Sequence, residues 1–66
     1  MFSLKALVDL YGIPLEVRSL GRPHWPPFTI VAEVDDLFYR VEDSDGRWSN
    51  VLKECKTTND YIAMNV

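Results

Sequence analysis

The strand-like segments of this 66-residue chain are separated by short breaks, and these breaks limit how the strands can pair. Antiparallel neighbours need only a tight turn, whereas parallel neighbours need a crossover of about a dozen residues or more. Segments rich in alternating apolar and polar or β-branched residues lie at 14–20, 28–34, 37–42, 47–52 and 61–66. The sequence therefore predicts a small, mainly antiparallel sheet of four to five strands.

The first segment, FSLKALVDLYG at residues 2–12, carries two apolar patterns. One has the spacing of a helical face and consists of Leu4, Leu7, Val8 and Tyr11. The other has the period of a strand and consists of Phe2, Leu4, Ala6, Val8 and Leu10. The helix is favoured because Ser3 can cap its first turn and Gly12 stands where a helix usually ends.

These elements predict an α+β fold in a single domain, residues 1–66, with a short N-terminal helix packed on the sheet. If residues 2–11 form a strand instead, the alternative is a small β-barrel of SH3-like type. A chain this short buries only about 60% of its unfolded surface. Its single cysteine, Cys55, excludes an intrachain disulfide, and one cysteine with one histidine does not make a Cys/His zinc site.

One shared strand face and two turns are predicted in the middle of the chain. The face consists of Phe28, Ile30, Ala32 and Val34. A two-residue turn is predicted at Asp35-Asp36, and Asp45-Gly46 is predicted to supply the positive φ angles of a second hairpin. Residues 47–52 continue either as a strand carrying Trp48 or as a strand that runs into a helical turn over Val51, Leu52 and Cys55.

Catalytic and metal-binding patterns find little support in the sequence. Cys55 and His24 could serve as nucleophile and base, but no spacing marks an orienting residue and no motif places the thiol in an electropositive setting. The DSDG segment contains part of a calcium-loop pattern. Aligning Gly46 with the sixth loop position, however, puts Val41 first and Leu52 last, where Asp and Glu are required. We therefore expect no catalytic residue, metal or cofactor.

The segment GRPHWPPF, residues 21–28, can neither run as a helix nor sit inside a sheet, because it holds three prolines. The prolines stiffen the backbone, so little loop entropy would be lost on binding. Aromatic residues beside arginine are typical of protein-interface hot spots. We predict a partner-binding loop with the contact residues Arg22, His24, Trp25 and Phe28. In the alternative, Trp25 and Phe28 fold back as a lid on the sheet.

Carboxylates are concentrated in residues 33–45, where six of the ten in the chain stand against one arginine. Such a surface repels phosphates and disfavours direct nucleic-acid binding. It could instead imitate a nucleic acid and occupy the basic cleft of a nucleic-acid-handling protein. The predicted acidic contact residues lie in turns at opposite ends of one strand and are Asp35, Asp36, Asp43 and Asp45. In the alternative, they serve turn chemistry and solubility.

Together these features predict a non-enzymatic, cytoplasmic module that binds an unidentified protein. The sequence contains no export signal and no run of ~18 apolar residues, which disfavours secretion and membrane insertion. The small size suits a phage or mobile-element accessory protein that inhibits or modulates a host protein. Two alternatives stay open, a single-stranded nucleic-acid-binding small β-barrel and a small structural or self-associating subunit.

Overall fold

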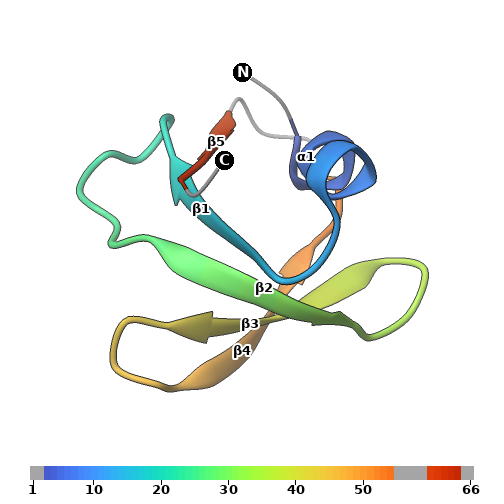
Figure 1. Ribbon diagram of the computed structural model, residues 1–66. Helices are drawn as coiled ribbons and strands as arrows, with labels where there is room; N and C mark the ends of the chain where they lie inside the picture. The colour runs from blue at the N-terminus through green and yellow to red at the C-terminus, as the bar shows by residue number, and fades with distance from the viewer. Residues whose placement is uncertain (1–2, 55–59, 65–66) are drawn as a thin grey trace.

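The computed structural model describes residues 3–54 and 60–64, which form one helix and a five-stranded antiparallel sheet (Figure 1). In chain order the elements are α1 (Leu4–Tyr11), β1 (Leu15–Ser19), β2 (Phe28–Glu33), β3 (Phe38–Asp43), β4 (Trp48–Leu52) and β5 (Tyr61–Ala63). The strand order is β4-β3-β2-β1-β5. The sheet is open, with β4 and β5 at its edges, so the α+β prediction is confirmed and the barrel alternative is wrong.

The helix forms between the two residues that the sequence marked as its limits. Ser3 accepts a hydrogen bond at Oγ from the Ala6 N–H, 3.2 Å away, and so caps the first turn. Gly12 ends the helix with a φ of 82°, and its N–H donates to the Val8 carbonyl at 2.7 Å. The helical prediction is therefore confirmed. Tyr11 departs from it, because this residue lies in the last turn and is 47% exposed.

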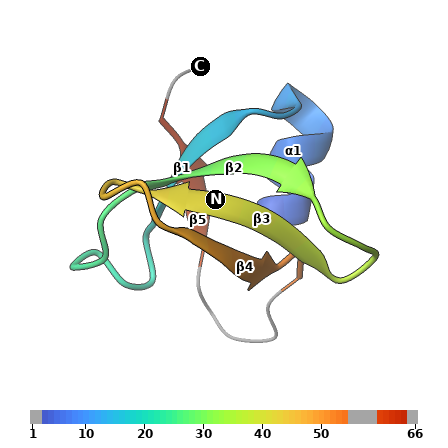
Figure 2. The same ribbon diagram turned by 90° about the horizontal axis from the view of Figure 1, so that it is seen from below.

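The core lies between α1 and one face of the sheet (Figures 1 and 2). It is small and consists almost entirely of aliphatic side chains, joined by two tyrosines. Its buried members are Leu4, Leu7, Leu15, Val17, Ile30, Tyr39, Val41 and Tyr61. The side chains that alternate with these on the strands point to the opposite face, which the helix does not cover.

A β-bulge in β2 changes the face on which its second half lies. Ile30 pairs with Val41, but the next pairs are Ala32 with Arg40 and Glu33 with Tyr39. The extra residue moves Ala32 to the exposed face and Glu33 to the face of the core. The prediction that four residues share one face thus holds for Phe28 and Ile30 and is wrong for Ala32 and Val34, both of which are exposed.

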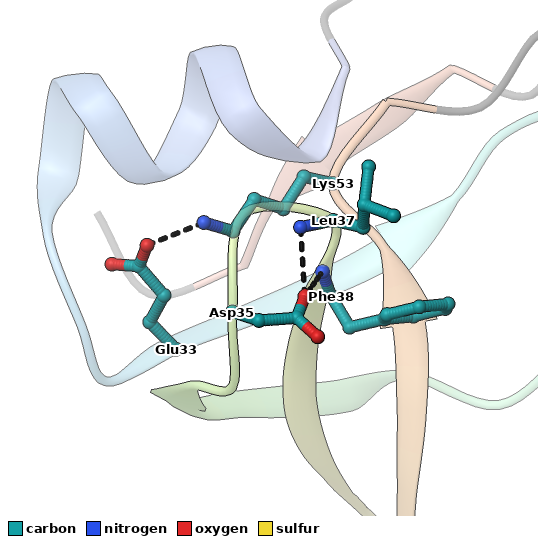
Figure 3. Close-up of polar contacts among 5 residues, drawn as sticks. All are labelled: Glu33, Asp35, Leu37, Phe38 and Lys53. Atoms are coloured by element: carbon teal, nitrogen blue, oxygen red, sulfur yellow. Dashed lines mark hydrogen bonds and ion pairs between the residues drawn. The ribbon is translucent and has the colours of Figure 1, made fainter.

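The β2–β3 connection spans residues 34–37 rather than the predicted two-residue Asp35-Asp36 turn. Asp35 organises it, because one carboxylate oxygen accepts the N–H groups of Leu37 and Phe38 at 2.8 and 3.0 Å (Figure 3). The Val34 N–H closes the hairpin onto the Phe38 carbonyl at 3.0 Å. An Asp side chain that caps the turn in this way replaces the positive φ angles that a two-residue hairpin would need.

The β3–β4 connection is built in the same manner around Asp43. Its Oδ1 accepts the N–H groups of Asp45 and Arg47 at 2.8 and 2.9 Å. Gly46 has a φ of 80° and donates its N–H to the Asp43 carbonyl. Asp45 keeps a negative φ, so only the glycine half of the predicted Asp45-Gly46 pair adopts the left-handed conformation.

The two last strands resolve the remaining alternatives. β4 runs to Leu52, so Val51 and Leu52 belong to a strand rather than to a helical turn. Cys55, the third residue of that alternative, lies outside the described residues. β5 is shorter than the predicted strand at 61–66, because Met64 already lies beyond its end.

Lys53 connects three parts of the chain at one end of the sheet. Its N–H donates to the Leu37 carbonyl at 2.8 Å, and its own carbonyl accepts the Lys5 N–H of α1 at 3.1 Å. Its side chain is largely buried, passes 5.1 Å from the centre of the Tyr39 ring and ends at the Glu33 carboxylate (Figure 3). This hydrogen bond to Glu33 raises the pKa of Lys53 above its ordinary value. The ion pair exists because the bulge turned Glu33 toward the core.

Ile30 is fully buried at the centre of the sheet. We therefore predict that the free energy of unfolding depends strongly on the size of the side chain at this position. We expect Ile30→Ala to lower the free energy of unfolding by about 2–5 kcal/mol and Ile30→Val by about 1 kcal/mol. Leu10→Ala, at a site that is 64% exposed, should change it by less than about 0.5 kcal/mol. Urea denaturation followed by circular dichroism measures all three. Equal effects of Ile30→Ala and Leu10→Ala would contradict the assigned core.

The Lys53–Glu33 pair predicts a loss of stability at alkaline pH. Burial raises the pKa of Tyr39 above 10.0, and the bond to Glu33 raises that of Lys53 above 10.5. Both groups hold their protons more tightly in the folded state, so their contribution is complete below those values and is lost as the pH rises through the folded pKa. The midpoint of urea denaturation, measured at several values between pH 8 and 12, should fall less steeply with rising pH for Glu33→Gln than for the wild type. Glu42→Gln is the matched control and should behave like the wild type.

Candidate functional site

The fold divides the eight predicted contact residues between two ends of the sheet. Phe28, which begins β2, pairs with Asp43, which ends β3. The loop of residues 20–27 and the turn of residues 44–47 therefore lie at the same end, which we call the Trp25 end (Figures 1 and 2). The turn of residues 34–37 lies at the opposite end, beside the N-terminus of α1. Asp35 and Asp36 are thus remote from the other predicted residues.

The Trp25 loop, residues 20–27, gathers three of the predicted residues in solvent. The indole of Trp25 is 41% exposed. The Arg22 guanidinium carbon lies 4.8 Å from the centre of its ring, within cation–π range. The His24 ring meets the same indole edge-on, with 6.2 Å between the ring centres. The side chains of Arg22 and His24 are themselves exposed, so the cluster forms a surface and not a lid on the core.

The first half of this loop is fastened to the sheet. Ser19, which is buried at the end of β1, accepts the Arg22 N–H at Oγ over 3.2 Å. The Leu20 N–H donates to the Asp60 carbonyl at 2.7 Å. A further turn closes where the Trp25 N–H donates to the Arg22 carbonyl at 3.0 Å. With Pro23, Pro26 and Pro27 fixing φ, these bonds leave the Trp25 backbone little freedom.

Phe28, the fourth predicted residue of this segment, has a different role. It is partly buried at the start of β2, packs against the core and meets the Tyr61 ring edge-to-face at 6.1 Å. The fold thus separates the two aromatic residues of the segment. Trp25 faces water, whereas Phe28 packs against the core, as the lid alternative predicted for both residues.

The acidic residues are used in two ways. Asp35 and Asp43 each hold two backbone N–H groups and so build the turns that carry them. Among the described residues, Asp36 and Asp45 are the turn carboxylates that accept no hydrogen bond, and both are exposed. Asp45 lies at the Trp25 end and Asp36 at the other, so these two carboxylates stand apart.

The structure adds two features that the sequence analysis missed. Trp48 on β4 is 66% exposed, and the Arg40 guanidinium carbon lies 5.3 Å from the centre of its ring. An open hollow of about 560 Å³ lies at the helix end and is lined by Ser3, Lys5, Asp36, Leu37, Leu52, Lys53 and Glu54. Alternation in RWSNVL could have placed Trp48 on a face, but not at an edge. The hollow joins segments far apart in the chain and has no local signal.

Comparisons with protein-family models, with curated proteins and with solved structures give no significant match for this chain. Across residues 3–54 and 60–64, no helix is long and apolar enough to cross a lipid bilayer. The same residues contain no group of three or more His, Cys, Asp or Glu side chains that could hold a metal ion.

The anchoring of the Trp25 loop predicts an effect of Ser19→Ala. The change removes the acceptor of the Arg22 N–H in a partly buried place and should cost about 1 kcal/mol of folding free energy. It should also accelerate hydrogen exchange at the Arg22 amide more than at amides of the core strands. Ser49→Ala, at an exposed serine of β4, is the matched control and should leave that exchange rate unchanged. If the hydrogen-exchange rate of the Arg22 amide is unchanged in Ser19→Ala, the bond to Ser19 Oγ does not anchor the loop.

Proposed function

We propose that this chain is a small, non-enzymatic module that binds a protein partner through the Trp25 loop. The observation that carries the proposal is the exposed indole of Trp25 with the Arg22 guanidinium stacked on it. Trp and Arg are the residues most enriched in the energetic centres of protein interfaces. A partner that covers this cluster gains a large apolar area and hydrogen bonds from the Arg22 fork at one point.

Rigidity supports the same proposal. Binding normally costs about 0.5–1.5 kcal/mol for each long side chain that becomes ordered, and more for a mobile loop. In the free protein the Arg22 side chain already rests on the indole, and Ser19 already holds the loop backbone. Most of the ordering is therefore complete before a partner arrives.

The charges around the loop favour a protein over a nucleic acid. Arg22 is the basic residue of the cluster, while Asp43 at the end of β3 and Asp45 and Arg47 in the turn of residues 44–47 put both signs of charge at the same end of the sheet. A single-strand binder tracks phosphates with a continuous basic groove, whereas this end of the sheet carries carboxylates as well as arginines. A protein surface can offer both signs of charge.

The acidic run is a weaker basis for a binding surface. Asp35 and Asp43 stabilise their turns, and Glu33 is paired with Lys53. Mimicry of a nucleic acid would rest mainly on Asp36, Glu42 and Asp45, which do not lie at one end of the sheet. We retain the Trp25 loop as the contact surface, and place the module in the cytoplasm as a protein that inhibits or modulates its partner.

The proposal is tested by affinity capture from cell lysate with the wild type and with Trp25→Ala and Arg22→Ala as baits, followed by mass spectrometry. We expect at least one protein that the wild type retains and that both variants lose. Against that purified protein, Trp25→Ala should weaken binding by roughly 30-fold or more, as loss of a hot-spot residue does. Circular dichroism verifies that the variants stay folded.

Leu37→Ala is the matched control, because Leu37 is an exposed apolar residue at the opposite end of the sheet. It should retain the partner. A Trp25→Ala bait that captures the same proteins as the wild type would contradict the proposed surface. If the wild type is retained on single-stranded DNA in a salt-sensitive manner and Trp25→Ala is not, the partner of this loop is a nucleic acid and not a protein.

A further inference from the structure

β4 is one of the two edge strands of the sheet. It has β3 on one side and no described strand on the other (Figure 2). Its five residues, WSNVL, include no charged residue and no proline. Natural edge strands are usually protected by lysine, proline, a bulge or short length. The other edge strand, β5, has only three residues, whereas β4 has none of these protections.

The alternation of hydrogen bonds shows which backbone groups of β4 face outward. The Arg47 carbonyl accepts the Asp43 N–H, and the Lys53 N–H donates to the Leu37 carbonyl, so the odd-numbered residues face β3. In an antiparallel ladder the intervening residues direct both N–H and C=O to the other side. Those residues are Trp48, Asn50 and Leu52.

The same three residues put their side chains on the face that α1 leaves uncovered. Trp48 and Leu52 are 66% and 45% exposed. They flank Asn50 at equal distances, two residues before and two residues after it. The strand is thus symmetric about Asn50, with a large apolar side chain and outward backbone groups at both ends.

We propose that β4 pairs antiparallel with β4 of a second copy of this chain, about a two-fold axis at Asn50. The register places Trp48 opposite Leu52 of the other copy and Asn50 opposite its own equivalent. Of the antiparallel registers, this one uses all three outward residues of both strands. The paired strands carry no charge, and just beyond their ends Arg47 lies opposite Lys53 of the other copy, whose charge is paired with Glu33.

The pairing also covers apolar surface on the open face. Within one chain Leu52 pairs with Phe38 across β3 and β4. In the dimer the Trp48 indole of the second copy extends this row, so three large apolar side chains lie side by side on each side of the axis. Within each chain the Arg40 guanidinium carbon lies 5.3 Å from the centre of the Trp48 ring, and in the dimer this ring would lie beside Leu52 of the other copy.

The test is a site-directed disulfide in a Cys55→Ser background, which removes the single native cysteine. Asn50→Cys places two thiols across the axis, about 5.5 Å apart at Cα, which a disulfide can span. We expect it to form a covalent dimer under mild oxidation. Trp48→Cys alone should not, since its equivalent lies about four residues away along the paired strand. A mixture of Trp48→Cys and Leu52→Cys should form the mixed dimer.

The mass in solution provides the second readout. Sedimentation equilibrium of the wild type should give twice the 7.6 kDa of one chain. Asn50→Pro removes an outward N–H without touching the bonds to β3, and Trp48→Lys adds a protective charge; both should give 7.6 kDa with unchanged circular dichroism. Leu10→Lys, on an exposed site of α1, should stay dimeric. A monomeric wild type, or cross-linking of Trp48→Cys as efficient as that of Asn50→Cys, would overturn the pairing.

Discussion

One helix of eight residues has to cover a sheet of five strands, and the rest of the structure follows from this shortage. The helix buries Leu4 and Leu7 against one face of the sheet, and among the described residues the core holds eight buried apolar side chains. The other face stays in water, where Arg40 rests on Trp48 and gives the indole a partner that the core does not supply. Stability at this size depends on filling one thin layer without loss, so binding functions must use the loops, the uncovered face or the edges.

The bulge at residues 30–32 determines which residues of the hydrophobic strand β2 face the single core layer. Without it, the alternation that begins at Ile30 would carry Ala32 and Val34 into the core and leave Glu33 outside. The extra residue exchanges these positions, so that Glu33 reaches Lys53 at the end of β4. The ion pair then joins the β2–β3 hairpin to the strand end that also binds α1 through the Lys5 N–H. Lys53 therefore contacts the bulged strand through its side chain and α1 through its backbone carbonyl.

Local sequence signals were sufficient to predict the helix and the strands. No such signal showed how these elements pack against one another. Ser3 and Gly12 limit the helix through interactions with residues at most four positions away, so both could be predicted. The bulge depends on the register between β2 and β3, which no short window encodes. For the site, the prolines indicated an exposed loop at Trp25 but could not show that Phe28 turns into the core. That β4 is an edge strand depends on the order of all five strands, so the sequence predicted a strand carrying Trp48 but not its place at the edge of the sheet.

The two proposed surfaces can operate together because of where β4 begins. Its first residue, Trp48, follows the turn at the Trp25 end, and its last residue lies at the helix end. Antiparallel pairing of two β4 strands therefore puts the two Trp25 loops at opposite ends of one continuous sheet. Such a dimer could engage two partner molecules independently, whereas a single partner would need two sites separated by the length of the joined sheet to bind both loops at once.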